Sequence, residues 1–279
     1  MNNHSFRADL HCHSTCSDGS DSPEQLIHLA IELGLKGLSI TDHDTIAAYE
    51  TAIPLAKELN FPLLSGVEFS SSHREEPVHV LGYGFDLKSP FISEFCDRHQ
   101  KRRRDRNAKI LEKLRKHRIV ISEDALYSRF HGTVGRPHIA LLLVEQGVVP
   151  SVKEAFQKYL GEGKPAYYPG ERITVEETIA CIKSAGGKAI LAHPHLLQRS
   201  TTIRDLLTMT FDGLEAYYAK MSPDQEKKWI EIAQEKQWIL TGGSDYHGEV
   251  KPNIPLGASW VNQETFESLY EHFHSQSTV

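Results

Sequence analysis

Histidines and carboxylates recur beside short apolar runs of this sequence, in a pattern that suits metal binding. His11 and His13 stand two residues apart in the run "RADLHCHS" (residues 7–14), and Asp18 follows five residues after the second. Side chains two residues apart in a strand lie on the same face. Because two imidazoles on one strand face can chelate a metal ion, we expect a metal site to begin at this strand.

Further candidate ligands stand at the edges of later apolar runs, where the strand ends of an α/β barrel meet at one rim. The full set is His11, His13, Asp18, His43, Glu68, His79, His193, Asp245 and His247. A zinc ion takes four ligands, so this set predicts a cluster of two or three ions. Imidazole and carboxylate ligands without cysteine suit Mn²⁺, Fe or Zn²⁺ better than Mg²⁺.

Strand-like and helix-like patterns alternate through most of the chain. We expect strands at 6–12, 37–41, 62–67, 78–83, 188–192, 213–217, 238–242 and 256–261, and helices at 23–34, 45–59, 174–185 and 223–236. Such alternation indicates an α/β fold with mainly parallel strands. Seven or eight strands favour a closed or distorted barrel over an open sheet.

The middle of the chain has helical spacing without strands. We therefore expect a barrel formed by residues 1–90 and 166–279, interrupted by a helical insertion at 91–165. The insertion contains residues 98–118, where eleven Lys or Arg stand against Asp105 and Glu112, a local charge of +9 in a chain of net charge −6. The net charge does not suit a protein that coats long nucleic acids, so we expect no binding to long duplexes.

Composition places the chain among folded proteins of the cytoplasm. Its 279 residues, 39% hydrophobic and 24% charged, can bury a full core. Four cysteines without a C-x-x-C pair predict free thiols in a reducing compartment. The amino-terminal stretch lacks the apolar segment of a secretory signal, and the aliphatic run 139–144 is too short for a membrane span. The sequence leaves the oligomeric state open.

Six motifs, taken in order, closely resemble those of the PHP (polymerase and histidinol phosphatase) family of metal-dependent phosphoesterases. They are "ADLHCHSTCSDGS", "GLSITDHDT", "GVEFS", "HVLGYG", "LAHPH" and "GSDYHG". The resemblance covers about residues 7–90 and 165–260. It implies the PHP fold, a distorted (β/α)7 barrel with a trinuclear metal centre.

The resemblance also implies a division of the ligands among three ions. By the family pattern, one ion is held by His11, His13, Glu68 and Asp245. A second is held by Asp18, His43 and His247, and Glu68 bridges to a third held by His79 and His193. Some family members have histidine where this chain has Asp18, so the second site differs from theirs in carrying an oxygen ligand.

The insertion is similar to that of one branch of the family, which acts on nucleotide ends. The motifs "VGRPHIA" (134–140) and "YLGEGKPAYYP" (159–169) carry this resemblance. Members of the branch include 3′,5′-nucleoside bisphosphate phosphatases and a 5′-to-3′ exoribonuclease. The resemblance implies hydrolysis of the 3′-side phosphoester of a nucleoside bisphosphate or a short 5′-phosphorylated RNA.

Clustered cations can activate a water and stabilise both the entering and the leaving oxygen. We therefore expect attack by a metal-bound hydroxide and no catalytic residue separate from the metal ligands. Arg136, His138 and Lys164 are candidates to bind a phosphate that the metals do not hold. Arg offers a planar bidentate fork to phosphate, whereas Lys offers a point charge.

Arg103 and Arg106 are further candidates for substrate binding. The apolar stripe that includes Ile110 and Leu114 continues through both arginines at helical spacing. Arginines that face inward need an anionic partner, and a substrate phosphate would supply one.

Two aspartates flank His43, and their roles have two interpretations. Asp42 and Asp44 could orient ligating imidazoles, or they could cap a helix that begins near Thr45. His195 would share a strand face with His193, but Pro194 interrupts the strand, so we leave His195 out of the metal set.

Three alternatives to a nucleotide phosphoesterase remain open. A histidinol-phosphatase-like enzyme does not explain the arginines of the insertion. A zinc amidohydrolase would need a bridging lysine late in its fourth strand, where this chain has "HVLGYG". A non-catalytic, metal-stabilised accessory module is disfavoured because all nine ligands are present. The sequence does not give the physiological substrate or the metal.

Overall fold

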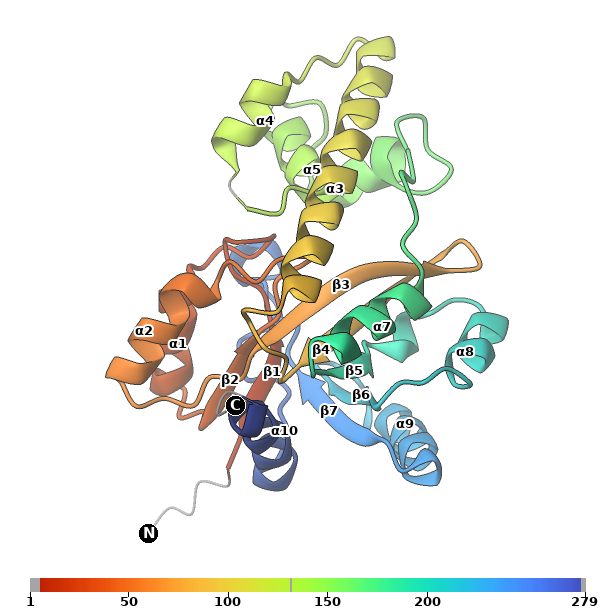
Figure 1. The fold of residues 1–279 in the computed structure, drawn as a ribbon. Coiled ribbons are helices and arrows are strands. Elements are labelled where there is room, and N and C mark those ends of the chain that lie inside the picture. Colours follow the sequence, from red (N-terminus) through yellow and green to blue (C-terminus); the bar gives the residue numbers. More distant parts are fainter. Residues whose placement is uncertain (1–5, 131, 277–279) are drawn as a thin grey trace. The chain divides into compact units, whose positions relative to one another are not determined.

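The computed structural model describes residues 6–130 and 132–276. Its strands are β1 (Ala8–Cys12), β2 (Gly37–Ile40), β3 (Gly66–His73), β4 (Glu76–Tyr83), β5 (Lys188–Leu191), β6 (Gly213–Tyr218) and β7 (Ile239–Gly243). Its α-helices are α1 (Pro23–Glu32), α2 (Tyr49–Glu58), α3 (Pro90–Lys116), α4 (Glu123–Arg129), α5 (Arg136–Glu145), α6 (Val152–Ala155), α7 (Val175–Ser184), α8 (Ser200–Leu206), α9 (Pro223–Lys236) and α10 (Gln263–Gln276) (Figure 1). The alternation of strands and helices confirms the predicted α/β class.

The chain folds as two compact units. One contains the residues up to Phe95 together with those from Ile173 onward, and it includes all seven strands. The other is Cys96–Arg172 and contains only helices and loops among its described residues. Within the described ranges, no helix combines the length and the apolar character needed to cross a membrane.

The strands form two sheets, β1-β2 and β3-β4-β5-β6-β7. The pairs β1–β2, β5–β6 and β6–β7 are parallel, whereas β4 runs antiparallel to both β3 and β5. A tight turn at Arg74 and Glu75, both with positive φ, joins β3 directly to β4. Because such a connection makes a hairpin, the prediction of mainly parallel strands fails at β4.

Backbone bridges join the two sheets at both of their seams. Between β2 and the segment that enters β3, Leu38 bridges Leu63, and His43 bridges Glu68 farther along. On the other side, Cys12 of β1 bridges Tyr246, just after β7. The bridges at His43 and Tyr246 lie beyond the carboxyl ends of β2 and β7, where the candidate metal ligands stand.

Two predicted strands differ from the structure. Residues 256–261 were expected as a strand, but their only described bridge joins Val261 to Ala8, because Gly257 has a φ of +74° and turns the chain. The strand expected at 62–67 begins only at Gly66 and extends to His73. This extension forms the hairpin with β4.

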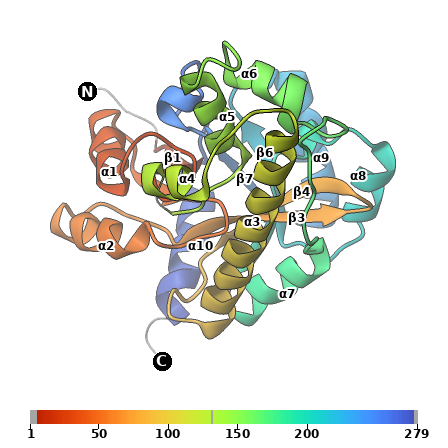
Figure 2. The same ribbon diagram turned by 90° about the horizontal axis from the view of Figure 1, so that it is seen from above.

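Helices cover the strands and are defined by local sequence signals. Helices α1 and α2 pack side by side in both views (Figures 1 and 2). Ser22, Thr174 and Ser222 each begin a helix with a capping box, in which the hydroxyl accepts an N–H of the first turn. Helix α9 has the predicted bounds, whereas α2 begins four residues later than expected, with Ala48 at its N-cap.

The unit Cys96–Arg172 has a hydrophobic core of its own. Apolar residues of α3, α4 and α5 pack together, with Ile110, Leu114, Leu126 and Ile139 fully buried. Helix α5 begins with Arg136 at its first position after Gly135, and Pro137 follows. Proline suits this position because the first N–H groups of a helix have no intrahelical partner.

Candidate metal centre

The first group of ligands joins β1 to β3 and to the residues after β7. His11 and His13 are completely buried, and their Nε2 atoms lie 3.2 and 3.1 Å from Oε2 of Glu68. The same two nitrogens lie 3.5 and 3.2 Å from Oδ1 of Asp245. One atom from each of the four side chains lies within 4.8 Å of the others, a spacing that suits one metal ion.

A second group lies beside the first and shares His13 with it. It contains His13, Asp18, His43 and His247, again with one atom from each within 4.8 Å of the others. Nε2 of His247 lies 3.3 Å from Oδ1 of Asp18, and Nε2 of His43 lies 3.9 Å from Oδ2. The predicted trio of Asp18, His43 and His247 is therefore brought together, with His13 as a fourth member.

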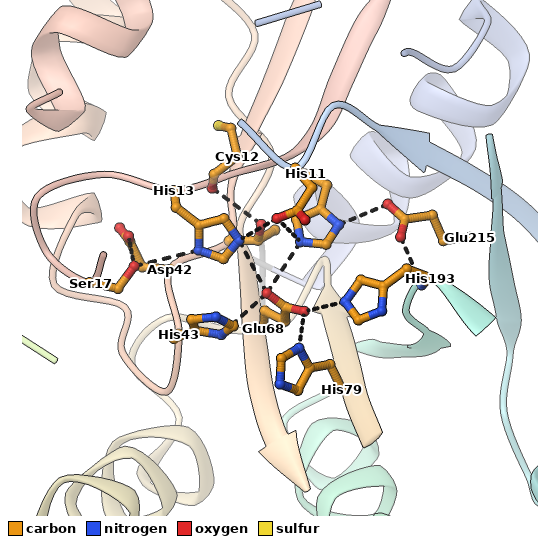
Figure 3. Close-up of polar contacts among 12 residues, drawn as sticks. His11, Cys12, His13, Ser17, Asp42, His43, Glu68, His79, His193 and Glu215 are labelled. Carbon is orange, nitrogen blue, oxygen red and sulfur yellow. Dashed lines mark hydrogen bonds and ion pairs between the residues drawn. The ribbon is translucent and has the colours of Figure 1, made fainter. Parts of the chain in front are cut away.

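Glu68 lies at the centre of the imidazoles (Figure 3). Its Oε1 contacts Nδ1 of His79 at 2.7 Å and Nε2 of His193 at 2.9 Å, while Oε2 faces the other histidines. A third group of mutually close atoms contains His43, Glu68 and His79. His193 contacts Glu68 but is not a member of this third group. The carboxylate thus presents one oxygen to each side of the cluster.

The orientation of the imidazoles indicates that a cation belongs between them and the carboxylates. Nδ1 of His11 lies 2.8 Å from a carboxylate oxygen of Glu215, and Nδ1 of His247 lies 2.9 Å from the carbonyl of Asp245. Each Nδ1 donates to an oxygen, so in the neutral ring the lone pair is on Nε2. That lone pair faces carboxylates, Glu68 in one case and Asp18 in the other. A proton or a metal ion must separate these groups.

Two buried nitrogens support a metal in this position. Nε2 of His13 and Nδ1 of His43 form no hydrogen bond within the described residues, although oxygens of Glu68 lie 3.1 and 3.2 Å away. Buried polar atoms normally have a partner. Six imidazoles and three carboxylates, with no cysteine among them, form a donor set that suits transition-metal ions. The residues therefore fit a cluster of divalent cations.

The electrostatics of the site keep its carboxylates ionised. Burial alone would raise their pKa, but neighbouring imidazoles hold the pKa of Asp18, Glu68 and Asp245 well below the usual range. Burial would lower the pKa of His13, yet its contacts with Asp245 and Glu68 raise it to about 9. For His43 burial prevails and lowers the pKa to about 3. These three largely buried negative charges therefore require positive partners.

Glu215 is a functional residue that the sequence analysis missed. It is fully buried in β6 and joins two ligands, because Oε1 contacts Nδ1 of His11 and Oε2 accepts the backbone N–H of His193, each at 2.8 Å (Figure 3). Such partners fix the orientation of ligating imidazoles. A carboxylate inside the otherwise apolar strand "GLEAYY" was the signal that could have identified it.

The two aspartates beside His43 bind mainly to serines and backbone groups. Asp42 accepts hydrogen bonds from the N–H of Ser14 and the hydroxyl of Ser17, and this hydroxyl lies 3.5 Å from Nδ1 of His13. Asp42 therefore reaches an imidazole through Ser17. Asp44 accepts the N–H of Ser70 at 2.7 Å, and the helix expected to begin near Thr45 has another N-cap, so the capping alternative is wrong.

The candidate substrate residues lie in the helical unit, and four of them gather at the start of α5. A Cβ at Gly135 would lie 2.9 Å from Nη1 of Arg103 and 3.8 Å from Nη2 of Arg106. Nδ1 of His138 accepts the N–H of Gly135 at 3.0 Å. The guanidinium of Arg136, the first residue of α5, lies over the rings of Phe156 and Tyr167.

The candidates differ in burial from one another and from the exposed arginines of the basic segment. Arg103 is 7% exposed, as expected for an arginine on the apolar stripe, whereas Arg115 is exposed. Burial lowers the pKa of Arg136. The positive charge of Arg103 lowers it further, whereas Tyr167 raises it. Lys164 is exposed on the loop that follows residues 156–160. The unit therefore holds several cations together at one helix N-terminus, a place that favours anions.

Comparison with known proteins finds the same family along most of the chain. A model of the PHP domain matches residues 9–168. The chain is 36% identical to the 5′-3′ exoribonuclease Rnm of Salmonella typhimurium, over 91% of this chain and 89% of the relative. It is 29% identical to a 3′,5′-nucleoside bisphosphate phosphatase of Chromobacterium violaceum, over 86% of each.

A solved structure is similar to this chain over nearly its whole length. The crystal structure of a proposed metal-dependent phosphoesterase from Bifidobacterium adolescentis superposes with a TM-score of 0.86 and 30% identity. The superposition covers 95% of this chain and 96% of that one. The likeness therefore extends over the strands, the ligand-bearing loops and the helical segment.

Replacing Glu68 should remove more metal than replacing one terminal ligand. We expect about two to three transition-metal equivalents per chain in the unchanged protein, because nine ligands exceed the needs of one ion. Glu68→Gln should lower metal content further than His79→Asn, since Glu68 faces two groups of ligands. Elemental analysis measures this, with exposed His28→Asn as the control. Equal metal content in the Glu68 and His79 variants would contradict a shared role for Glu68.

Glu215→Gln should weaken metal binding while leaving every ligand in place. The amide cannot accept from both the His11 ring and the backbone N–H of His193 with the same strength, so the His11 imidazole and the backbone at His193 lose their orientation. We expect roughly ten- to hundredfold weaker Mn²⁺ binding, measured by isothermal titration calorimetry. Glu235→Gln, an exposed change on α9, is the matched control. Unchanged affinity in the Glu215 variant would assign this residue to the fold alone.

Proposed function

The chain belongs to the PHP domain family, and we propose that it hydrolyses the 3′-side phosphoester of 5′-phosphorylated nucleotides. Its substrates would be nucleoside 3′,5′-bisphosphates and short 5′-phosphorylated RNA. Of the two relatives named above, one is a 5′-3′ exoribonuclease and the other a 3′,5′-nucleoside bisphosphate phosphatase. An enzyme that recognises a terminal phosphate and hydrolyses the phosphoester on its 3′ side would serve both.

The observation that carries this proposal is the position of Glu68 between groups of imidazoles. Its two oxygens face different histidines, which is the arrangement that a cluster of two or three divalent cations needs. When bound, such cations polarise phosphoryl oxygens, activate water at neutral pH and stabilise the leaving oxygen. The complete set of nine candidate ligands favours a catalytic cluster over an accessory module that does not catalyse a reaction.

The chain's own residues hold and orient these ligands. Glu215 fixes His11 and the backbone of His193, and the carbonyl of Asp245 fixes His247. The three ionised carboxylates offset the charge of the cations. Manganese is our preferred ion for the mixed nitrogen and oxygen donors, with iron or zinc as alternatives.

We assign the binding of a second substrate phosphate to the helical insertion. Arg103, Arg106, Arg136 and His138 surround the N-terminus of α5, and the positive end of the helix dipole there also favours an anion. Lys164 is an additional candidate in the same unit. A phosphate held there would fix the nucleotide end, and this would separate substrate positioning from the chemistry.

We also interpret the two sheets as a distorted seven-stranded barrel. Bridges at Leu38, His43 and Tyr246 join the sheets along both seams and support this interpretation. The strand ends would then converge on one rim, as in other barrels with catalytic sites. A cytoplasmic location is supported by four cysteines that are all free thiols, as in a reducing compartment.

The proposal predicts activity on two substrates. Protein supplied with Mn²⁺ is incubated in parallel with adenosine 3′,5′-bisphosphate and with a 5′-phosphorylated RNA pentamer. We expect phosphate release from the first substrate and mononucleotide release from the second, with both reactions stopped by a chelator. Turnover of histidinol phosphate with neither nucleotide hydrolysed would contradict the nucleotide assignment and favour a small-molecule phosphatase.

Arg136→Ala should distinguish binding of the nucleotide end from the chemistry. The loss of one charge-assisted contact costs roughly 2 to 3 kcal/mol, which lowers kcat/KM on the order of a hundredfold. We expect this loss on adenosine 3′,5′-bisphosphate but not on a simple aryl phosphate that lacks a second phosphate. Exposed Arg115→Ala is the matched control. An equal loss on both substrates would move Arg136 to the reacting phosphoryl group, and no loss would remove it from the substrate site.

A further inference from the structure

Asp245 is a candidate ligand that is held in place by contacts of both its backbone and its side chain. It follows β7 with a φ of +55°, in the left-handed region that few side chains other than Asp and Asn adopt easily. Its N–H donates to the carbonyl of His11 at 2.7 Å. The direction in which the carboxylate leaves the backbone is therefore determined by the adjoining strand.

The two oxygens of this carboxylate have different environments. Oδ1 faces the metal group, 3.2 Å from Nε2 of His13 and 3.5 Å from Nε2 of His11. Oδ2 accepts two hydrogen bonds, from the hydroxyl of Tyr218 at 2.6 Å and from Nζ of Lys251 at 2.7 Å. Both donors bind the oxygen that the imidazoles do not face.

The two donors come from separate parts of the chain. Tyr218 is the last residue of β6, and Lys251 follows the short helical turn Gly248–Val250. A rotation that turned Oδ2 toward the histidines would break both hydrogen bonds. One of these is charge-assisted, and such bonds are about twice as strong as neutral ones.

This arrangement limits the number of oxygens in the first ligand group. Glu68 directs only Oε2 toward His11 and His13, because Oε1 contacts other histidines. With Asp245 offering only Oδ1, the group presents two nitrogens and two oxygens. Ca²⁺ prefers six to eight oxygens and often uses carboxylates that bind through both oxygens. Mn²⁺ accepts a mixture of imidazole and carboxylate ligands.

We propose that Tyr218 and Lys251 confine Asp245 to one metal-facing oxygen and thereby select transition-metal ions such as Mn²⁺ over Ca²⁺. They act through Asp245 and are positioning residues. The inference rests on the proposed metal-dependent function, and it concerns the choice of ion. If the two donors are removed, Oδ2 becomes available as an additional hard oxygen ligand. Ca²⁺ should gain more from this than Mn²⁺.

Competition between the two ions tests the proposal without substrate. Bound Mn²⁺ is displaced by added Ca²⁺, and free Mn²⁺ is followed by electron paramagnetic resonance. For the double variant Tyr218→Phe with Lys251→Met, we expect half-displacement at an about tenfold lower Ca²⁺ concentration than for the unchanged protein. Lys251→Met alone should shift it in the same direction by less, and Lys251→Arg should keep the original value. The matched control is Tyr217→Phe with Lys220→Met.

The possible outcomes are distinguishable. An unchanged displacement curve in a double variant that still binds Mn²⁺ would overturn the selectivity role. Loss of Mn²⁺ binding from Lys251→Met, without a gain for Ca²⁺, would also overturn it, because the donors would then determine affinity for any ion. If the unchanged protein failed to bind Mn²⁺, the proposed metal-dependent function itself would fail.

Discussion

The contact of the buried Glu68 carboxylate with the surrounding imidazoles is the interaction on which the rest of this structure depends. Glu68 is 1% exposed, and five imidazoles lie within 3.2 Å of its two oxygens. A carboxylate buried without a positive partner is strongly destabilising. The site therefore needs cations, either protons on the imidazoles or metal ions between the ligands. Metal binding and the stability of this part of the fold are accordingly coupled.

The mixed direction of the strands explains how so many ligands reach one carboxylate. Parallel strands bring the groups at their carboxyl ends to one side, which places His13, His43 and Asp245 near Glu68. His79 stands near the middle of β4 instead, and it reaches Glu68 because the hairpin pairs it with Ser70, two residues farther along β3. A fully parallel sheet would have needed a crossover between these two strands.

The sequence predicts which histidines and carboxylates gather in the fold better than it predicts the groups that orient them. His11 and His13 have a spacing that only a strand brings to one face, and the later ligands stand beside recognisable apolar runs. Glu215 and Tyr218 have no such spacing, because each acts on a ligand from another part of the chain. Lys251 lies only six residues after Asp245, but that spacing is typical of no regular element. The pairing of Glu215 and Tyr218 with these ligands depends on which strands are neighbours. A sequence pattern does not specify strand order, so these partners become visible only in the folded structure.

The boundaries of helices and strands also depend partly on neighbouring residues and partly on residues far away in the sequence. Helix α9 matches its predicted bounds because Ser222 and Pro223 provide a local start signal. Strand β4 was predicted, but its antiparallel direction was not, because the hydrophobic pattern does not encode strand direction. Residues 256–261 contain apolar side chains typical of a strand, but the turn at Gly257 prevents regular pairing. A local signal was sufficient for the start of α9, whereas strand pairing depended on long-range contacts.

Anomalous diffraction from crystals grown with Mn²⁺ would test the central role of Glu68 most directly. The account predicts anomalous peaks on both sides of this carboxylate, one near Oε2 with His11 and His13, and one near Oε1 with His79. Each peak should lie within coordination distance of a Glu68 oxygen. Peaks located away from Glu68, or a single ion that leaves one oxygen without a metal, would contradict the shared carboxylate.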